Sequence, residues 1–441
     1  MAEKTFCFRI YLNNKGLATN SVNYPEKFLS SEAIERRFLH EIPIDETDFP
    51  IAESLIYEIQ VMGFEPITQS KWLKTIVVET KDSAKIETLK EVAFADSVRC
   101  VWAGEDRTET KPCESDTSRF LSQDKNLEIE YGYADSQIRM LNGIQLHHKG
   151  YKGKNMRIAV IDAGFMHVDR IEAFAGLHLL GVHNETFPNH SFYCDDEHGT
   201  KALSCMAANL PGVMVGTAPD ADYLLIKSED TRGEFPIEED FWVAAVEYAD
   251  SFGVDVISSS LGYYKFDGID SLYTQSDLNG KTALTSKAAE MAAKKGILIV
   301  SSAGNEGNSE WEKITFPSDA EHILTVGSVS VDKQKSLFSS VGLTADFRIK
   351  PDVVALGSNV CVITAAGQVQ TTNGTSFSAP TVAGLAACLW QAFPLLKNTD
   401  IITLIQNSAS QSQTPDVQLG YGIPDFLKAF NTARNDELRQ F

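Results

Sequence analysis

Short apolar runs alternate with longer segments of helical pattern over most of the chain, from about residue 126 to about residue 430. The runs are rich in branched apolar residues, which is typical of strands buried on both faces of a parallel sheet. They lie at 156–161, 223–227, 254–259, 297–301 and 323–329. Helices are predicted at 136–148, 198–209, 237–252, 282–295, 376–392 and 398–408. This alternation predicts an α/β domain in which helices flank both faces of a mainly parallel β-sheet.

The first 110 or so residues follow a different pattern. Strand-like stretches lie at 5–12, 64–68, 72–79 and 97–102. Helical stretches lie at 31–39, 50–62 and 84–92. The order is β-α-β-β-α-β with one extra helix, which predicts a small α+β domain of the ferredoxin-like (split βαβ) kind.

A polar segment at 104–118 separates the two patterns. It is charged and has no periodicity, so we expect an exposed linker that can be cleaved. We divide the chain into an α+β domain at 1–110, a linker at 111–127 and a larger domain at 128–441. If the chain processes itself, the cut is expected between Arg107 and Glu130.

The composition narrows the classes of function. The 441 residues carry a net charge of −21, which argues against nucleic-acid binding because that requires basic surfaces. An apolar content of 43% can support more than one core. No stretch approaches the roughly 18 apolar residues of a transmembrane helix. The N-terminus shows no apolar segment of the kind found in secretory signals.

Three polar residues stand where catalytic groups collect. Asp162 ends the apolar run 156–161, and His198 begins the helical stretch 198–209. Ser376 opens a helix that is apolar nearly all round, so its N-terminal N–H groups are expected to point at one buried place. A serine becomes nucleophilic when a histidine takes its proton, and a carboxylate fixes the tautomer of that histidine. Singly the three residues would also suit a strand end, an acidic loop and a helix cap; together they favour hydrolysis.

The segments around these residues resemble the subtilisin-like serine peptidases (subtilases). They are Val160-Ile161-Asp162-Ala163-Gly164, His198-Gly199-Thr200 and Gly374-Thr375-Ser376-Phe377-Ser378-Ala379-Pro380, in the order Asp, His, Ser. The resemblance covers about 126–430. It implies a serine endopeptidase that hydrolyses peptide bonds of proteins through an acyl-enzyme, with Asp162, His198 and Ser376 as its triad. Ala163 departs from the family, which usually has Ser or Thr there, so Asp162 lacks a hydroxyl partner.

The same resemblance assigns residues around the triad. Asn305 is the implied oxyanion donor, together with the backbone N–H of Ser376. The floor of the pocket for the residue before the cut is expected within 314–318. The walls of the substrate groove, whose backbones would hold an extended peptide, are implied at Ser260, Leu261, Gly262, Ser302, Ala303 and Gly304.

The N-terminal domain resembles a subtilase propeptide, which assists folding and blocks the groove. The resemblance therefore implies a zymogen whose own N-terminal domain is an intramolecular inhibitor, beside protein or peptide substrates. Subtilases with propeptides are mostly exported. We therefore expect a secreted or periplasmic protein from which a signal peptide has been trimmed, with a cytoplasmic protein as the alternative.

Calcium is common in the family and is a candidate ion. Oxygen ligands lie near turns at 267–270 and 276–280, although neither turn has the spacing of an EF-hand. No other cofactor is indicated, and no Cys/His spacing predicts a zinc site. The seven cysteines are too few for a disulfide scaffold. Cys100 and Cys113 flank the linker and are candidates for a pair.

Two other classes of function were weighed. A non-catalytic or permanently inhibited binding protein could keep this fold, but the complete triad and Asn305 argue against it. A serine esterase is also conceivable. The chain lacks the G-x-S-x-G elbow of that class, and its propeptide-like domain argues for a peptidase.

Overall fold

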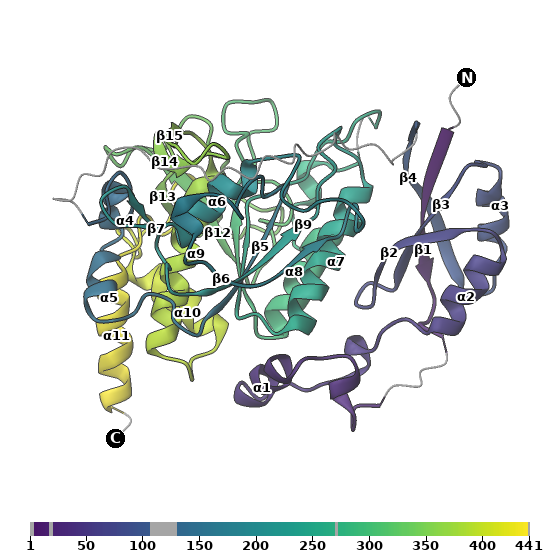
Figure 1. The fold of residues 1–441 in the computed structure, drawn as a ribbon, viewed down its shortest axis with the longest axis horizontal. Helices are drawn as coiled ribbons and strands as arrows, with labels where there is room; N and C mark the ends of the chain where they lie inside the picture. The colour runs from purple at the N-terminus through teal and green to yellow at the C-terminus, as the bar shows by residue number, and fades with distance from the viewer. Residues whose placement is uncertain (1–3, 17–20, 106–129, 270–271, 440–441) are drawn as a thin grey trace.

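The computed structural model describes residues 4–16, 21–105, 130–269 and 272–439, with side chains up to residue 436 (Figure 1). Within them, a seven-stranded sheet forms the centre of the large domain, and each of its neighbouring pairs is parallel. In spatial order the strands are β13 (Val353–Leu356), β12 (Leu324–Val329), β11 (Leu298–Ser302), β10 (Val256–Ser259), β5 (Arg157–Asp162), β9 (Asp222–Lys227) and β6 (His178–Asn184). The predicted parallel α/β domain is confirmed.

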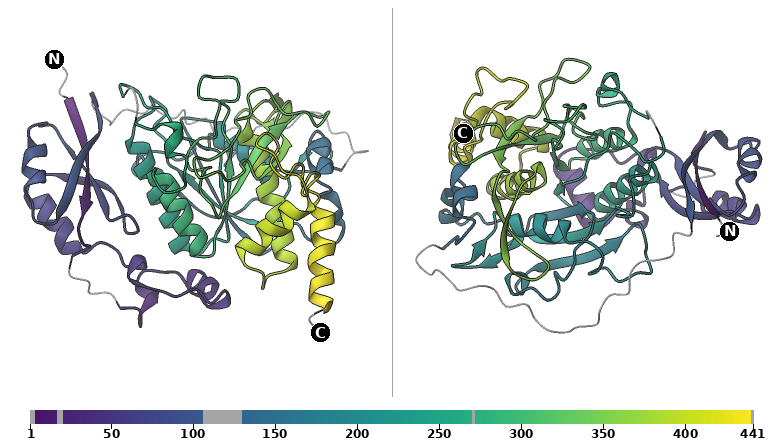
Figure 2. Two further views of the ribbon diagram at one scale, coloured as in Figure 1. Left: turned by 180° about the vertical axis from the view of Figure 1, so that it is seen from behind. Right: turned by 90° about the horizontal axis from the view of Figure 1, so that it is seen from above.

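Helices cover both faces of this sheet (Figures 1 and 2). They are α4 (Asp135–Met140), α5 (Ile144–His148), α6 (His198–Ala207), α7 (Ile237–Phe252), α8 (Leu284–Lys294), α9 (Thr375–Ala392), α10 (Asn398–Ser408) and α11 (Phe426–Arg439). Ala159 and Ile161 of β5 belong to one buried cluster with α7 and α8, whereas Ile158 and Val160 belong to another with α6 and α9. Successive side chains of the central strand are thus buried on opposite faces, as a double-sided core requires.

One helix prediction for the large domain is wrong, and two strands of its sheet were not predicted. The helix predicted at 136–148 is two helices, because Asn142 has a φ of 54° and a Cβ at Gly143 would lie 2.6 Å from the Leu385 side chain. The strands that were not predicted are the two edge strands, β6 and β13. The residues of β6 are mostly exposed or half-buried, so it lacks a continuous apolar run, and β13 is only four residues long.

The N-terminal region contains a four-stranded antiparallel sheet in the order β2-β3-β1-β4. Its elements are β1 (Lys4–Leu12), α1 (Ser31–Leu39), α2 (Glu53–Val61), β2 (Glu65–Ser70), β3 (Thr75–Thr80), α3 (Lys85–Lys90) and β4 (Ala95–Glu105). This is the predicted split βαβ order with one extra helix. Apolar residues of α2, such as Leu55 and Ile59, share a core with one face of the sheet.

The opposite face of this small sheet packs on the large domain. Cys7, Val77 and Trp102 form a buried cluster with Ile237 and Phe241 of α7. Figures 1 and 2 show the small sheet beside α7 at one end of the molecule. Helix α7 is therefore buried between the two sheets.

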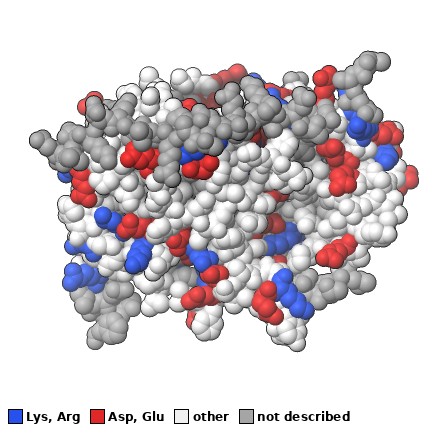
Figure 3. Space-filling model, in the orientation of Figure 1, with Lys and Arg blue, Asp and Glu red and all other residues white. Residues whose placement is uncertain are grey.

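Short elements complete the described chain. They are the strand pairs β7 (Asn209–Leu210) with β8 (Met214–Val215) and β14 (Val360–Ile363) with β15 (Val369–Thr372), and the 3₁₀ turns η1 (Pro25–Lys27), η2 (Glu46–Asp48), η3 (Glu172–Phe174) and η4 (Gln275–Asp277). On the face drawn in Figure 3, basic side chains are interspersed with acidic ones. None of the described helices has both the length and the apolar character needed to cross a bilayer.

The cysteines differ from one expectation. Cys100 carries a free thiol, so the pair expected between Cys100 and Cys113 is wrong; Cys113 itself lies outside the described residues. Cys194 is disulfide-bonded. Cys388 is buried in α9 with a free thiol, and burial raises its pKa, which keeps it protonated and unreactive.

Candidate active site

Asp162 and His198 form a hydrogen-bonded pair at the carboxyl end of β5. The Asp162 side chain is fully buried, whereas that of His198, the first residue of α6, is 34% exposed. His198 Nδ1 lies 2.7 Å from Asp162 Oδ1, which also accepts the Ala163 N–H at 2.8 Å. Asp162 Oδ2 has no hydrogen-bond partner among the described residues, and Ala163 offers it no hydroxyl. Because Nδ1 is engaged with the carboxylate, Nε2 is the nitrogen left to accept a proton.

The charges around His198 stabilise its protonated form. Burial lowers the pKa of His198, but the Asp162 carboxylate and then Asp196 raise it, and the net pKa lies above the ordinary histidine value. Asp196 also accepts the backbone N–H of His198 at 2.6 Å. Lys201, which pairs with Glu197 at 2.5 Å, lowers the pKa of His198. The site can therefore hold a proton on the imidazole, as a general base must during a reaction.

Ser376, the second residue of α9, lies close to this pair. The ring of its neighbour Phe377 lies 5.6 Å from the His198 ring, measured between centroids. Ser376 is 6% exposed, and its Oγ donates to the carbonyl oxygen of Ser260 at 3.3 Å. In return, Ser260 Oγ donates to the carbonyl oxygen of Ser376 at 2.8 Å. The structure thus packs the residue after Ser376 against His198, while the Ser376 hydroxyl donates to Ser260.

Pro380 explains why Ser260 can reach the Ser376 carbonyl. Pro380 lies inside α9, beyond its first turn. Because proline has no N–H, the carbonyl four residues earlier, that of Ser376, receives no helical hydrogen bond. The Ser260 hydroxyl supplies the missing donor. The hydrogen bond from Ser260 to the Ser376 carbonyl therefore connects the end of β10 to the start of α9.

Asn305 is held in one orientation by Thr375. The Thr375 N–H and hydroxyl donate to Asn305 Oδ1 at 2.9 and 3.0 Å. A backbone N–H can only donate, so the amide oxygen must face Thr375 and the NH₂ group must point away. Asn305 is exposed, and the Ser376 N–H lies in the first turn of α9, where N–H groups lack the usual helical acceptor. The arrangement offers an amide and a helix N-terminus as donors to one anion.

The six expected groove residues follow two neighbouring strands, β10 and β11. Ser260 is buried, Leu261 is half-buried and Gly262 is exposed. Ser302, Ala303 and Gly304 are buried, and their carbonyl oxygens accept hydrogen bonds from within the protein. The first group therefore offers the more open backbone to an extended peptide.

Thr315 lies between the two groups of groove residues. A Cβ at Gly262 would lie 2.1 Å from Thr315 Oγ1, and one at Gly304 would lie 3.0 Å from the same oxygen. Thr315 is 3% exposed, and its hydroxyl has no partner among the described residues. It falls within the range expected for the pocket floor, 314–318, and it fills space between the walls.

Sequence reasoning missed the supporting roles of three residues: Thr375, Thr315 and Asp196. Thr375 directly precedes Ser376, so asking what orients Asn305 could have found it. Asp196 lies two residues before His198 in an acidic run, so its effect on the pKa of the histidine could have been inferred from the sequence. No local pattern marks Thr315, because its neighbours are distant in sequence.

The turns expected to bind calcium use their oxygens for other contacts. Asp277 Oδ2 accepts the N–H and the hydroxyl of Thr274, both at 2.8 Å, and Asn279 Oδ1 accepts the Lys281 N–H at 2.9 Å. Asp270 lies outside the described residues. The turn at 276–280 is therefore closed by its own side chains.

Another group of described residues brings three carboxylates together, although Glu238 also accepts the N–H groups of Asp230 and Phe235 at 3.1 and 3.0 Å. Carboxylate oxygens of Glu229, Glu234 and Glu238 lie within 4.8 Å of one another. Burial, and then the neighbouring carboxylates, raise the pKa of Glu229 to about 8 and that of Glu234 to about 7. Tyr263, which follows Gly262 of the groove, donates a hydrogen bond to Glu229. Burial and the like charges beside it therefore favour the protonated form of Glu229 near neutral pH.

The N-terminal sheet binds the large domain through acidic residues of α7. Arg9 Nε lies 2.7 Å from Asp240 Oδ1, and both side chains are almost fully buried. The Glu247 carboxylate accepts the N–H groups of Lys71 and Trp72 at 2.8 and 3.0 Å. The buried charges are paired and the buried N–H groups have acceptors, so this contact is a specific interface between the N-terminal sheet and α7.

Comparison with known proteins shows which families the two parts of the chain resemble. The profile of the Subtilase family matches residues 153–422, and that of the Peptidase S8 propeptide domain, Bacteroidota, matches residues 7–116. The chain is similar to Subtilisin NAT of Bacillus subtilis subsp. natto, with 30% identity over 69% of this chain and 74% of the relative. It is 29% identical to Subtilisin DY of Bacillus licheniformis over 62% of this chain and 90% of the relative. It is also 29% identical to the Major intracellular serine protease of Bacillus subtilis (strain 168), over 57% and 73%.

Proposed function

This chain belongs to the subtilase family, and we propose that it cleaves internal peptide bonds of proteins through an acyl-enzyme formed on Ser376. It is a subtilisin-like serine endopeptidase with a propeptide domain. The observation that carries the residue assignment is the His198–Asp162 hydrogen bond of 2.7 Å beside the N-terminus of α9.

In the proposed reaction, Ser376 Oγ attacks the scissile carbonyl carbon while His198 Nε2 takes the hydroxyl proton. Asp162 fixes the imidazole through Nδ1 and stabilises the imidazolium. The tetrahedral oxyanion accepts hydrogen bonds from the Asn305 NH₂ group and the Ser376 N–H. The imidazolium then gives its proton to the leaving amine. Water, activated by the same histidine, attacks the acyl-enzyme and regenerates Ser376.

One rotation must precede the attack. In this structure the Ser376 hydroxyl donates to Ser260, so its proton must turn toward His198 Nε2. Hydrogen bonds of this kind are often longer or misaligned without substrate and tighten when substrate binds. We infer that a peptide lying along Ser260, Leu261 and Gly262 favours the rotated form.

The N-terminal domain acts in this proposal as an intramolecular inhibitor and folding partner. Its sheet is fixed to α7 by Arg9, Lys71 and Trp72. Helix α7 also contacts β10, the strand that leads into the groove residue Ser260, because Trp242 Nε1 donates to Ser259 Oγ at 3.0 Å. The chain is then a zymogen, and linker cleavage is the activating step. Ser376→Ala is expected to accumulate full-length chain; equal fragmentation of the variant and the wild type would refute self-processing.

A direct assay of protein hydrolysis tests the proposed function. The linker-cut chain is incubated with casein, and new N-termini are mapped by mass spectrometry. We expect internal cleavage by the wild type and a loss of about 10⁶-fold in turnover for Ser376→Ala, the scale measured for a nucleophile deletion in a subtilisin. Activity confined to small esters, with casein intact, would support an esterase instead.

Two finer points stay predictions. We propose export, because the propeptide domain is the family's usual companion of exported enzymes; cell fractionation tests this, and one relative is named as intracellular. Calcium is a candidate structural ion, with Glu229, Glu234 and Glu238 as its ligands. Addition of calcium is expected to raise the melting temperature of the wild type and not that of Glu238→Gln.

A further inference from the structure

Residues 30–48, which we call the clamp, pack on the large domain rather than on their own sheet. The clamp contains α1 and η2. The buried core of the N-terminal sheet draws on its strands, α2 and α3, and none of its described members comes from the clamp. In Figure 1, α1 lies below α7 and α8, away from the four-stranded sheet.

Two arginines of the clamp form ion pairs with one carboxylate of α7. Arg36 Nη2 lies 2.6 Å from Asp250 Oδ1, and Arg37 Nη2 lies 2.7 Å from Asp250 Oδ2. The exposed fractions of the three side chains are 3%, 1% and 0%. Two guanidinium groups hold the pKa of Asp250 below its ordinary value despite its burial. Loss of this buried, bidentate arrangement would therefore weaken the binding of the clamp to α7.

The clamp also satisfies backbone carbonyls at the ends of two helices. Ser30 Oγ donates to the Phe252 carbonyl at the end of α7, and the Ser30 N–H donates to the Ser251 carbonyl, both at 2.9 Å. Arg36 Nε donates to the Lys295 carbonyl just past α8, at 3.2 Å. Helix C-termini leave carbonyls without helical donors and favour cations. The clamp is therefore complementary to the C-terminal ends of α7 and α8.

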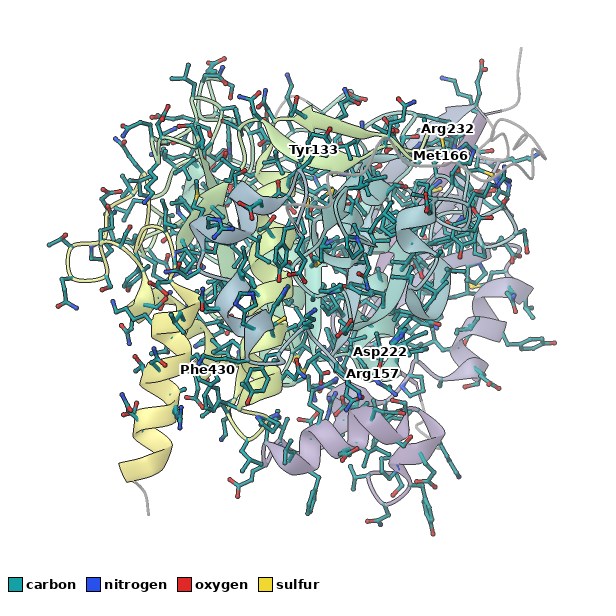
Figure 4. All side chains as sticks on the ribbon, turned by 60° about the vertical axis from the view of Figure 1, so that its left-hand side comes forward. Tyr133, Arg157, Met166, Asp222, Arg232 and Phe430 are labelled. Atoms are coloured by element: carbon teal, nitrogen blue, oxygen red, sulfur yellow. The ribbon has the colours of Figure 1, made fainter. Side chains whose placement is uncertain are left out.

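Further contacts extend this surface on both sides. Asp48 Oδ2 lies 2.8 Å from Lys295 Nζ, and its Oδ1 lies 2.9 Å from Arg37 Nη2. Glu32 pairs at 2.6 Å with Arg157, which Figure 4 shows beside α1. A Cβ at Gly253 would lie 2.7 Å from the clamp backbone, so glycine permits the close approach.

The clamp lies at the edge of the sheet opposite the catalytic groups. Helices α7 and α8 end just before β10 and β11 begin, whereas Ser260 and Ser302 lie where those strands end. Arg36 donates to the carbonyl of Val254, and Ser376 donates to that of Ser260. At about 3.3 Å per residue, the two carbonyls are about 20 Å apart along the strand. The clamp therefore cannot fill the groove.

We propose that the clamp is a second docking element, which holds the N-terminal region on the large domain after the linker is cut. Its partner is the surface formed by the C-terminal ends of α7 and α8. The N-terminal region is then bound at two places, the sheet on the side of α7 and the clamp at the helix ends, so release of either leaves the other engaged. That the retained N-terminal region inhibits the enzyme rests on the proposed function. That the region stays bound to the large domain does not.

The test measures dissociation rather than catalysis. The full chain carries Ser376→Ala and a site for a specific protease within the linker, and is cut there. We expect the N-terminal fragment to co-elute with the large domain in size-exclusion chromatography. In Arg36→Ala/Arg37→Ala the fragment is expected to leave on the order of 100-fold faster, because buried charge pairs at an interface act mainly on the dissociation rate. Equal dissociation rates would overturn the proposal.

Controls keep the outcome unambiguous. Arg139→Ala removes an exposed arginine that pairs within α4, and should leave the dissociation rate unchanged. If the double variant does not fold before cutting, Asp48→Asn replaces it; it keeps the shape of the side chain and is expected to speed release on the order of tenfold. A wild-type rate for Asp48→Asn would then refute the proposal. Failure of the proposed function would appear instead in the casein assay, which this test does not use.

Discussion

At the scale of single residues, the charges beside His198 set the pH range of activity. The reaction needs neutral His198, and its pKa is raised, so activity should be lost as pH falls through a value above the ordinary histidine pKa. Asp196→Asn removes a charge that raises this pKa, so the acid limb of the pH profile of kcat/KM should move to lower pH. Lys201→Gln removes a charge that lowers it, so the limb should move to higher pH. Shifts of the same sign in both variants would contradict this electrostatic account.

The orientation of Asn305 leads to a second prediction at this scale. Asn305→Ala is expected to lower kcat by about 10²–10³-fold with little change in KM, the effect measured for such a donor in a subtilisin. Thr375→Val keeps the backbone N–H that orients Asn305 but loses the hydroxyl, so a loss of about tenfold is expected. Steady-state kinetics on a peptide substrate measures both. A rise in KM with unchanged kcat would instead make Asn305 a ground-state binding residue.

Sequence could identify the candidate chemical groups but not what positions them. Asp162, His198, Ser376 and Asn305 each stand beside a short motif, so local pattern and resemblance suffice to nominate them. The bond from Ser260 to the Ser376 carbonyl depends on two segments that meet only in the folded chain. No periodicity carries that information.

At the scale of elements, helix α9 is packed too closely to accept a larger residue at Gly384. Helix propensity alone would favour alanine there by about 1 kcal/mol. However, a Cβ at Gly384 would lie 2.1 Å from Thr217 Oγ1, so Gly384→Ala is expected to destabilise the fold by about 1–3 kcal/mol. Thermal unfolding in the Ser376→Ala background measures this.

Gly176→Ala provides the matched control, because nothing lies within 4 Å of a Cβ at that position. Its melting temperature should stay within about 1 °C of the parent. A higher melting temperature for Gly384→Ala would show that propensity outweighs packing in this helix.

Most strands buried on both faces and most long helices were predictable, because their apolar patterns are continuous. The four-residue strand β13 and the C-terminal helix α11 were not. The interruption at Asn142 and the edge strand β6 were not, since one depends on a single backbone conformation and the other lacks a buried run. Helix α1 was predicted as an element, but its partners α7 and α8 were not. Its buried arginines have no local signature that tells a partner surface from solvent.

At the scale of the whole molecule, Glu247 connects the N-terminal sheet to α7. Glu247→Ala would leave the N–H groups of Lys71 and Trp72 without their acceptor. We expect this variant to weaken inhibition by the N-terminal fragment by about 30–100-fold, because unpaired buried donors cost about 2–3 kcal/mol. The measurement is the inhibition constant of the fragment after linker cleavage. Glu310→Ala, on an exposed glutamate, is the control, and equal inhibition constants for the two variants would contradict the docking described here.

The most direct test of the account is covalent labelling of the nucleophile. A fluorophosphonate probe is applied to the chain after residues 1–105 have been removed, and the labelled peptide is mapped by mass spectrometry. The account predicts a single adduct on Ser376, lost in Ser376→Ala and much slower in His198→Ala. An unlabelled wild type, or an adduct on another residue that survives Ser376→Ala, would contradict it.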